Sequence, residues 1–203
     1  MIDAVLLGAI AGYAIAMPVG PIAVLILRTG MRDGLRAALA AGAGCATADL
    51  VYASLAMLAG PALVSLIAPV LRPARLVAAA LLLLLAVRGL RATDTVTSER
   101  EPAPAGRTYV TVLGLTLLNP STVIYFASLA VGLPQVSVEP AARALFVVAA
   151  AVASLSWQWL LAGAGASLHG RVPPRLGRVT AIGSALIIGG LALKIAADAL
   201  GAP

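Results

Sequence analysis

The sequence predicts an all-α membrane protein with six transmembrane helices. Of its 203 residues, 61% are hydrophobic and 11% are charged, and the mean hydropathy is +1.03. A soluble domain carries about 25% charged residues. The apolar residues form runs long enough for a helix to cross a bilayer, bounded by arginines. We expect a single domain, residues 1–203, with spans at 4–27, 37–60, 74–90, 108–133, 141–168 and 179–200.

The first span is interrupted near its middle by the run AMPVGPIA, in which Pro18 and Pro21 flank Gly20. Proline has no N–H, so the carbonyls of Ala14 and Met17 lose their helical partners. In hydrocarbon, such a break persists only where protein, water or a ligand satisfies the backbone. We expect a second half-helix to begin beyond Gly20, with N–H groups suited to a carboxylate. A plain proline kink is the alternative.

The second span carries the one acid that lies deep inside a predicted helix. Asp49 is the thirteenth residue of this span, and a carboxylate at the bilayer centre costs about 2.5–3.5 kcal/mol. We expect Asp49 to bind a substrate ammonium or to carry a proton, or else to accept a hydrogen bond from a neighbouring helix. Tyr52 shares its helix face and either donates to Asp49 or packs in the core. Cys45, the only cysteine, is expected to act as a small apolar residue.

Two later spans leave alternatives open. The short apolar piece 62–71, which precedes the third span, either extends the second span or lies at the membrane interface. In the fifth span, Trp157, Gln158 and Trp159 lie too deep for an interfacial aromatic belt. They either line a path through the protein or fill its core. Glycines in the second, fifth and sixth spans are expected to let helices approach closely.

The fourth span is broken by a second proline, in the run LLNPSTV. Pro120 removes the partner of the Thr116 carbonyl and pushes Asn119 away from helical geometry. The Asn119 amide can both donate and accept hydrogen bonds. It therefore suits either a zwitterionic substrate or a freed carbonyl.

The chain divides into two halves of three spans, joined by a polar linker at 92–107. An odd number of spans in each half places the halves in opposite orientations, as in an inverted repeat. Repeat one covers about 1–91 and repeat two about 108–203, with broken helices one and four at corresponding places. Such paired breaks are the best sequence indication of a transporter's binding site.

The basic residues indicate orientation. Ten of the 14 lysines and arginines lie after span one, around the linker, and between spans five and six. The positive-inside rule therefore places loops one, three and five in the cytoplasm and both termini outside. The placement of the basic residues behind the net charge of +6 thus indicates orientation in a lipid bilayer and not a nucleic-acid partner. The sequence has no Cys/His cluster, HExxH, Walker loop or GxSxG, so we expect no enzyme, no metal site and no cofactor.

Two segments resemble the LysE/RhtB (lysine exporter) superfamily of bacterial amino-acid exporters. They are MPVGPIAVLILRTGMRDGLRAALAAGAGCATADLVYASLA and NPSTVIYFASL. LLLLLAVRGLRA and GSALIIGGLAL resemble the third and sixth spans of the family, so the resemblance covers nearly the whole chain. This chain has Pro-Val-Gly-Pro where many members have Pro-Gly-Pro, and Ala48–Asp49 where many have Gly-Asp.

The resemblance implies secondary active export of amino acids or similar small metabolites across the bacterial inner (plasma) membrane, driven by the proton gradient. It implies substrate-binding roles for Pro18, Gly20, Pro21, Asp49, Asn119 and Pro120, to which the shared helix face adds Tyr52, with Asp49 as the proton-coupling group. Two alternatives remain: a metal-cation exporter of the same superfamily, and a non-transporting membrane scaffold subunit. The substrate and the choice between a monomer and a homodimer stay open.

Overall fold

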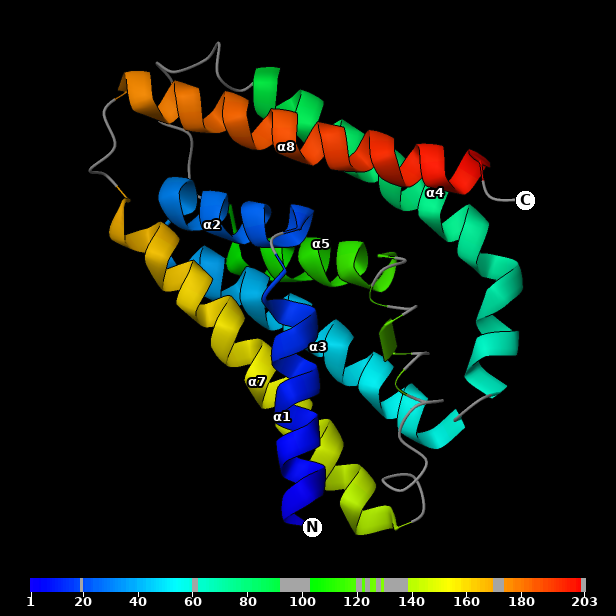
Figure 1. The fold of residues 1–203 in the computed structure, drawn as a ribbon. Helices are drawn as coiled ribbons and strands as arrows, with labels where there is room; N and C mark the ends of the chain where they lie inside the picture. Colours follow the sequence, from blue (N-terminus) through cyan, green and yellow to red (C-terminus); the bar gives the residue numbers. More distant parts are fainter. Residues whose placement is uncertain are drawn as a thin grey trace.

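The computed structural model describes residues 1–18, 20–59, 62–91, 103–119, 139–169 and 174–201, with 122, 125, 126 and 129. Across these residues all regular structure is helical (Figure 1), which confirms the all-α class. The helices are α1 (Ile2–Ala16), α2 (Pro21–Asp33), α3 (Leu35–Ala59), α4 (Ala62–Arg91), α5 (Ala105–Leu117), α7 (Pro140–Ser167) and α8 (Pro174–Gly201). Most of the predicted linker, 92–102, lies outside the described residues.

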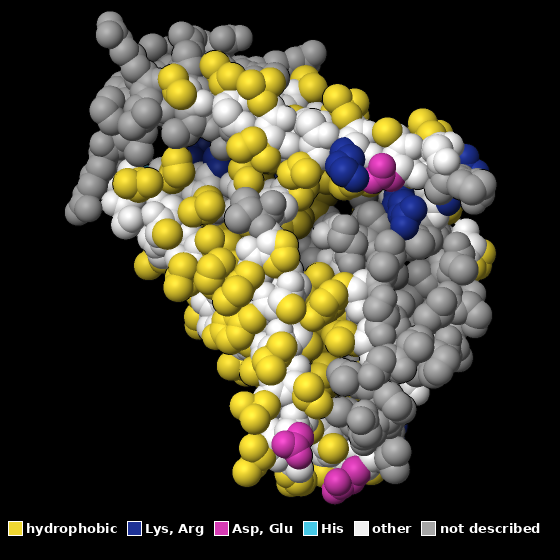
Figure 2. All heavy atoms as spheres, in the orientation of Figure 1, with side chains coloured by type: hydrophobic (Ala, Val, Ile, Leu, Met, Phe, Trp, Pro, Cys, Tyr) yellow, Lys and Arg dark blue, Asp and Glu magenta, His cyan; other side chains and the backbone are white. Residues whose placement is uncertain are grey.

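Several of these helices suit a membrane. Within the described residues, α3 and α7 are each long and apolar enough to cross a bilayer, and the bent pair α1 and α2 supplies a third candidate. Figure 2 shows hydrophobic side chains over much of the visible surface, and α7 alone exposes Val148, Val152 and Leu160. Soluble monomers rarely expose large continuous apolar patches. The chain is therefore a membrane protein, while the arrangement of six spans stays a prediction.

The first predicted span is two helices instead of one. α1 ends at Ala16 and α2 begins at Pro21, with an angle of 76° between them. Gly20 caps α2 in an extended conformation, with φ −113° and ψ −175°. Pro21 takes the first helical position, where a missing N–H removes no helical hydrogen bond. The predicted break at Pro18–Pro21 is confirmed.

The fourth predicted span also stops where expected, but its freed carbonyl is not left unpaired. α5 ends at Leu117, and the N–H of Asn119 donates to the carbonyl of Thr116 at 3.0 Å. A tightened last turn thus satisfies the group that Pro120 was predicted to orphan. Pro120 itself lies outside the described residues.

The short apolar piece 62–71 belongs to helix α4. It is the first part of one helix, Ala62–Arg91, that continues into the predicted third span. It therefore does not extend the second span, and its position relative to the membrane interface stays a prediction. Pro69 and Pro73 lie inside α4, and Figure 1 shows the helix bending before it runs alongside α8, as prolines in a helix interior cause.

Glycines set how closely the helices pack. A Cβ on Gly12 of α1 would lie 2.2 Å from the carbonyl oxygen of Ala150 in α7, and one on Gly165 of α7 would lie 2.3 Å from that of Leu27 in α2. A Cβ on Gly44 of α3 would lie 2.4 Å from a backbone oxygen of α5. Only glycine fits at such distances, which confirms the expected close packing for the second and fifth spans. In the sixth span the expectation is wrong, because a Cβ on Gly189 would meet only an ordinary contact at 3.7 Å and one on Gly190 would meet nothing within 4 Å.

Candidate functional site

A cavity of about 60 Å³ lies where the break between α1 and α2 faces α3, α5 and α7. Five of the seven predicted site residues line it: Pro18, Gly20, Pro21, Asp49 and Asn119. The structure adds Cys45, Thr116, Thr122 and Gln158 to the polar or reactive part of this lining. The two helix breaks and the membrane-embedded acid, far apart in the sequence, thus meet at one place.

Asp49 is held at the crossing of α3 and α7. Its side chain is buried, with the residue 4% exposed, and its Oδ2 accepts a hydrogen bond of 2.6 Å from Ser154 Oγ. Asp49 lies fourteen residues from Leu35 at the start of α3, and Ser154 lies fourteen residues from Pro140 at the start of α7. The acid therefore has one fixed donor and also reaches the cavity.

The start of α2 faces the same cavity. Ile22 and Ala23, in its first turn, line the cavity, and the first N–H groups of a helix have no partner within it. Leaving aside the two chain neighbours of Gly20, a Cβ built on it would have the Pro18 carbonyl oxygen as its nearest neighbour, at 4.0 Å. The open side of Gly20 gives a small polar group access to the positive end of the α2 dipole.

Gln158 occupies the cavity wall contributed by α7. The residue is 3% exposed, and its Oε1 has no hydrogen-bond partner among the described residues. Its Cβ packs beside Gly42 of α3, 3.1 Å from where a Cβ on that glycine would lie. The neighbouring Trp159 is instead 46% exposed, and its Nε1 donates to the Leu39 carbonyl at 3.3 Å. Of the mid-span residues 157–159, Gln158 is thus the one that faces the cavity.

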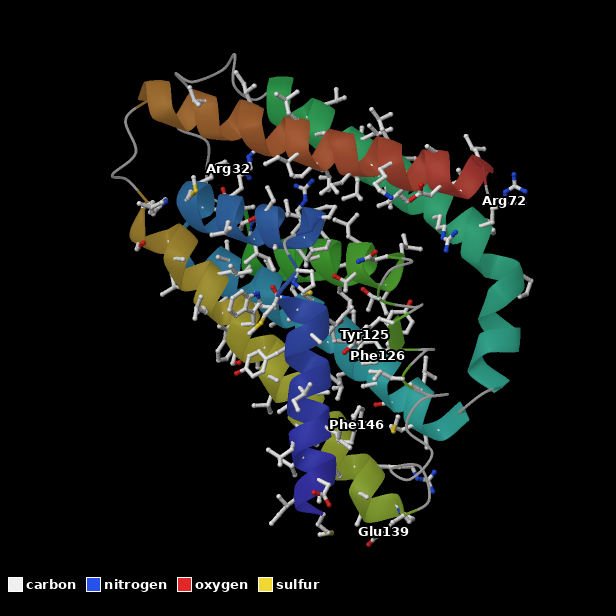
Figure 3. The ribbon with its side chains drawn as sticks, viewed as in Figure 1. Arg32, Arg72, Tyr125, Phe126, Glu139 and Phe146 are labelled. Atoms are coloured by element: carbon white, nitrogen blue, oxygen red, sulfur yellow. The ribbon has the colours of Figure 1, made fainter. Side chains whose placement is uncertain are left out.

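Tyr52 does not donate to Asp49, which corrects the alternative raised from their shared face. Its hydroxyl donates to the carbonyl of Leu117, the last residue of α5, and Tyr52 is not part of the described cavity lining. Tyr125 acts similarly on the other broken span: its hydroxyl donates to the Ala11 carbonyl of α1 at 2.9 Å. Both rings pack on Phe126, with centroid distances of 6.4 and 5.5 Å. Figure 3 shows Tyr125 and Phe126 side by side.

Two apolar clusters lie along the helices on either side of the polar residues. On α3, the cluster with Ile26 contains Ala38, Ala41 and Cys45, and the cluster with Phe146 contains Ala53, Ala56 and Met57. Asp49 falls between these two stretches of α3. On α7, Ser154 and Gln158 likewise fall between the residues of the two clusters, which are Ala142 and Phe146 on one side and Ala162 on the other. The cavity is therefore a polar layer between two apolar layers.

Some site residues give little or no signal in the sequence. Ser154 is one hydroxyl in an alanine-rich span, and only its spacing of four from Gln158 indicates that the two share a helix face. Cys45 belongs to an apolar cluster, as expected, but also lines the cavity. Thr116 directs its hydroxyl to its own helix, donating to the Val112 carbonyl at 2.8 Å.

The described lining of the cavity carries little charge. Asp49 is the one charged side chain in its described lining. Among the residues that the structure describes, no three His, Cys, Asp or Glu side chains come together. The arrangement combines one carboxylate, amide and hydroxyl groups, and the start of a helix.

Comparison with known proteins gives one match. The family model of the LysE type translocators matches residues 13–199, nearly the whole chain. No curated protein and no solved structure matches the chain. The matched region includes both helix breaks and every residue that lines the cavity. Members of this family are transporters, and the chain belongs to the LysE type translocator family.

Proposed function

We propose that this protein exports amino acids or similar small metabolites across the bacterial plasma membrane, coupled to protons. The observation that carries the proposal is the cavity itself, where a buried carboxylate and two interrupted helices converge. A carboxylate inside a membrane domain normally marks a substrate or ion pathway. Membership of a translocator family supports the same conclusion.

The cavity has a group for each charge of a zwitterion. The N–H groups at the start of α2, next to Pro21, suit the carboxylate of an amino acid. Asp49 suits its ammonium, and the Asn119 amide provides further hydrogen bonds. In this conformation the cavity, at about 60 Å³, is far smaller than the roughly 300–1,000 Å³ of sites that enclose drug-sized ligands. The two halves would therefore have to move apart to admit a larger substrate, as alternating access requires.

The packing supports an inverted repeat and alternating access. α1, the first helix of repeat one, packs on α7, and α5, the first helix of repeat two, packs on α3. The hydrogen bond between Asp49 and Ser154 joins equivalent positions of α3 and α7. We expect the two halves to rock about this crossing, so that the cavity opens first to the cytoplasm and then outward. Asp49 would bind a proton on one of the two strokes.

The proposed orientation has loops one, three and five in the cytoplasm and both termini outside. Figure 3 places Arg32, near the end of α2, and Glu139, just before α7, at opposite ends of the molecule. The end of the molecule with Arg32 is the one that the proposal assigns to the cytoplasm, because the positive-inside rule counts lysines and arginines. Fusing a reporter enzyme to each predicted loop tests the assignment.

The two rival functions are less well supported. Ca²⁺ takes six to eight oxygen ligands, usually with several carboxylates, whereas the described cavity lining has the single carboxylate of Asp49. A scaffold subunit accounts for the Asp49–Ser154 bond as an interhelical contact. It does not account for a polar cavity at two helix breaks.

The proposal is tested with Asp49→Asn and a matched control, Asp198→Asn. Asp198 is an exposed acid of α8 that pairs with Lys194 at 2.7 Å, far along the chain from the cavity lining. Cells that overproduce the wild type should resist toxic amino-acid analogues, and liposomes containing it should export amino acids when a proton gradient is imposed. Asp49→Asn should lose the gradient-driven component, while Asp198→Asn should behave as the wild type.

Full proton-driven export by Asp49→Asn would remove the coupling role. The absence of both analogue resistance and amino-acid transport in the wild type, with the protein present in the membrane, would favour the scaffold alternative.

A further inference from the structure

Gln158 carries a buried amide oxygen for which the described residues provide no hydrogen-bond partner. It is 3% exposed, it lines the cavity, and its Oε1 has no partner among the described residues. Most buried polar side-chain atoms in proteins have a hydrogen-bond partner, and an unsatisfied one calls for an explanation. The position is also fixed by packing, because the Cβ of Gln158 lies against Gly42 of α3.

The neighbours of Gln158 show which partner would suit it. Ser154 lies one helical turn earlier on the same face of α7 and already donates to Asp49. Gln158 and Asp49 therefore both line the one small cavity, one with an amide oxygen and the other with a carboxylate. Two acceptors that face one cavity suit a ligand with several donors, and an ammonium group has three.

We propose that Gln158 binds the substrate ammonium together with Asp49 and thereby sets the charge of the substrate. This inference rests on the proposed export of amino acids. A pair made of one carboxylate and one neutral amide balances a single ammonium. The site therefore selects zwitterionic amino acids over those that carry a second ammonium on the side chain. A second carboxylate in place of the amide would relax that selection.

The experiment measures counterflow of each ¹⁴C-labelled standard amino acid into liposomes that contain the purified full-length protein. The variants are Gln158→Leu, which removes the amide, and Gln158→Glu, which replaces it with a carboxylate of similar size. Leu160→Met is the matched control, because Leu160 is 59% exposed on the same helix, two residues further on. Thermal unfolding in detergent is measured for all four proteins.

For Gln158→Leu we expect the apparent affinity for the best zwitterionic substrate to fall about ten- to hundredfold, the effect of losing a hydrogen bond to a charged group. The unfolding temperature should stay the same or rise, because the variant removes a buried acceptor without a partner. A merely structural glutamine would give the opposite pattern, with lower thermal stability and unchanged affinity. That pattern would overturn the inference.

For Gln158→Glu we expect counterflow of L-lysine or L-arginine that the wild type lacks. This variant also tests the reversed amide, in which the NH₂ of Gln158 would donate to the substrate carboxylate. A glutamate cannot donate in that way when ionised, so loss of all exchange in a folded Gln158→Glu would overturn the ammonium assignment. If the wild type exchanges no amino acid, the proposed function fails. If the wild type exchanges amino acids and Gln158→Leu binds them with the same apparent affinity, only this inference fails.

Discussion

The Ser154 hydroxyl donates to the Asp49 carboxylate at 2.6 Å, and this bond joins the two helices that cross at the centre of the protein. Both residues are buried, with exposed fractions of 0% and 4%. A hydrogen bond to a charged group is worth about 1.5–3 kcal/mol. The bond therefore both stabilises the crossing of α3 and α7 and orients the carboxylate towards the cavity.

We predict that Ser154→Ala lowers the free energy of unfolding by about 1–3 kcal/mol, because Asp49 then loses its donor in a buried site. Export should also fall, since the carboxylate is no longer held in place. Denaturation in detergent and transport in liposomes measure the two effects. Ser167→Ala, on an exposed part of the same helix, is the control and should change neither. Unaltered stability in Ser154→Ala would contradict the role given to this bond.

Gly20→Ala should impair transport without preventing folding. The backbone angle of Gly20, φ −113°, is accessible to alanine, and the nearest atom to the added Cβ would be 4.0 Å away. The loss of glycine at the helix cap should cost about 1 kcal/mol or less. The methyl group would instead occupy the cavity and lower substrate affinity by about tenfold, the scale of an overpacked site.

Counterflow assays and membrane-fraction yields test this prediction. Gly106→Ala is the control, because nothing lies within 4 Å of its added Cβ. Equal transport by the two variants would show that the open side of Gly20 does not contact substrate.

Gly12→Ala should destabilise the fold itself. Its Cβ would lie 2.2 Å from the backbone oxygen of Ala150, so α1 would have to move away from α7. Overpacking of this kind costs about 1–3 kcal/mol or more. Gly114→Ala, where a Cβ meets nothing within 4 Å, should be neutral or slightly stabilising. Equal thermal unfolding temperatures for the two variants would argue against the close α1–α7 contact.

Cys45 provides a chemical probe of the cavity, because it is the only cysteine of the chain. It is 5% exposed and lines the cavity beside Asp49. A small neutral methanethiosulfonate should therefore modify it slowly and inhibit export. Bound substrate should slow the modification, and Cys45→Ala should resist the reagent. Labelling that is rapid and indifferent to substrate would place the thiol outside the transport path.

Asn119→Ala should reach the membrane at normal levels but bind substrate about tenfold more weakly, through loss of an amide hydrogen bond in the cavity. Thr111→Ala is the control on α5, because Thr111 is exposed and its hydroxyl donates to the Arg107 carbonyl of its own helix. Unchanged substrate affinity in Asn119→Ala would show that Asn119 does not bind substrate and has only a structural role.

Several features followed from the sequence because they depend on local chemistry. Proline disfavours the continuation of a helix, so the ends of α1 and α5 and the start of α2 were predictable from Pro18, Pro21 and Pro120, although α4 accommodates two prolines by bending. A carboxylate in an apolar span requires a polar neighbour, so the burial of Asp49 beside other polar groups was predictable as well. The motifs around these residues also predicted the family that the chain matches.

Other features depend on how helices far apart in the sequence meet. The sequence alone does not show that Ser154 is the donor to Asp49, or that Tyr52 turns to the Leu117 carbonyl instead. It left Gln158 undecided between core and cavity. These partners are fixed by the approach of α7 and α5 to α3, which small residues such as Gly42 and Gly44 allow. Local propensity determined where the helices break, and tertiary packing decided which side chains the breaks face.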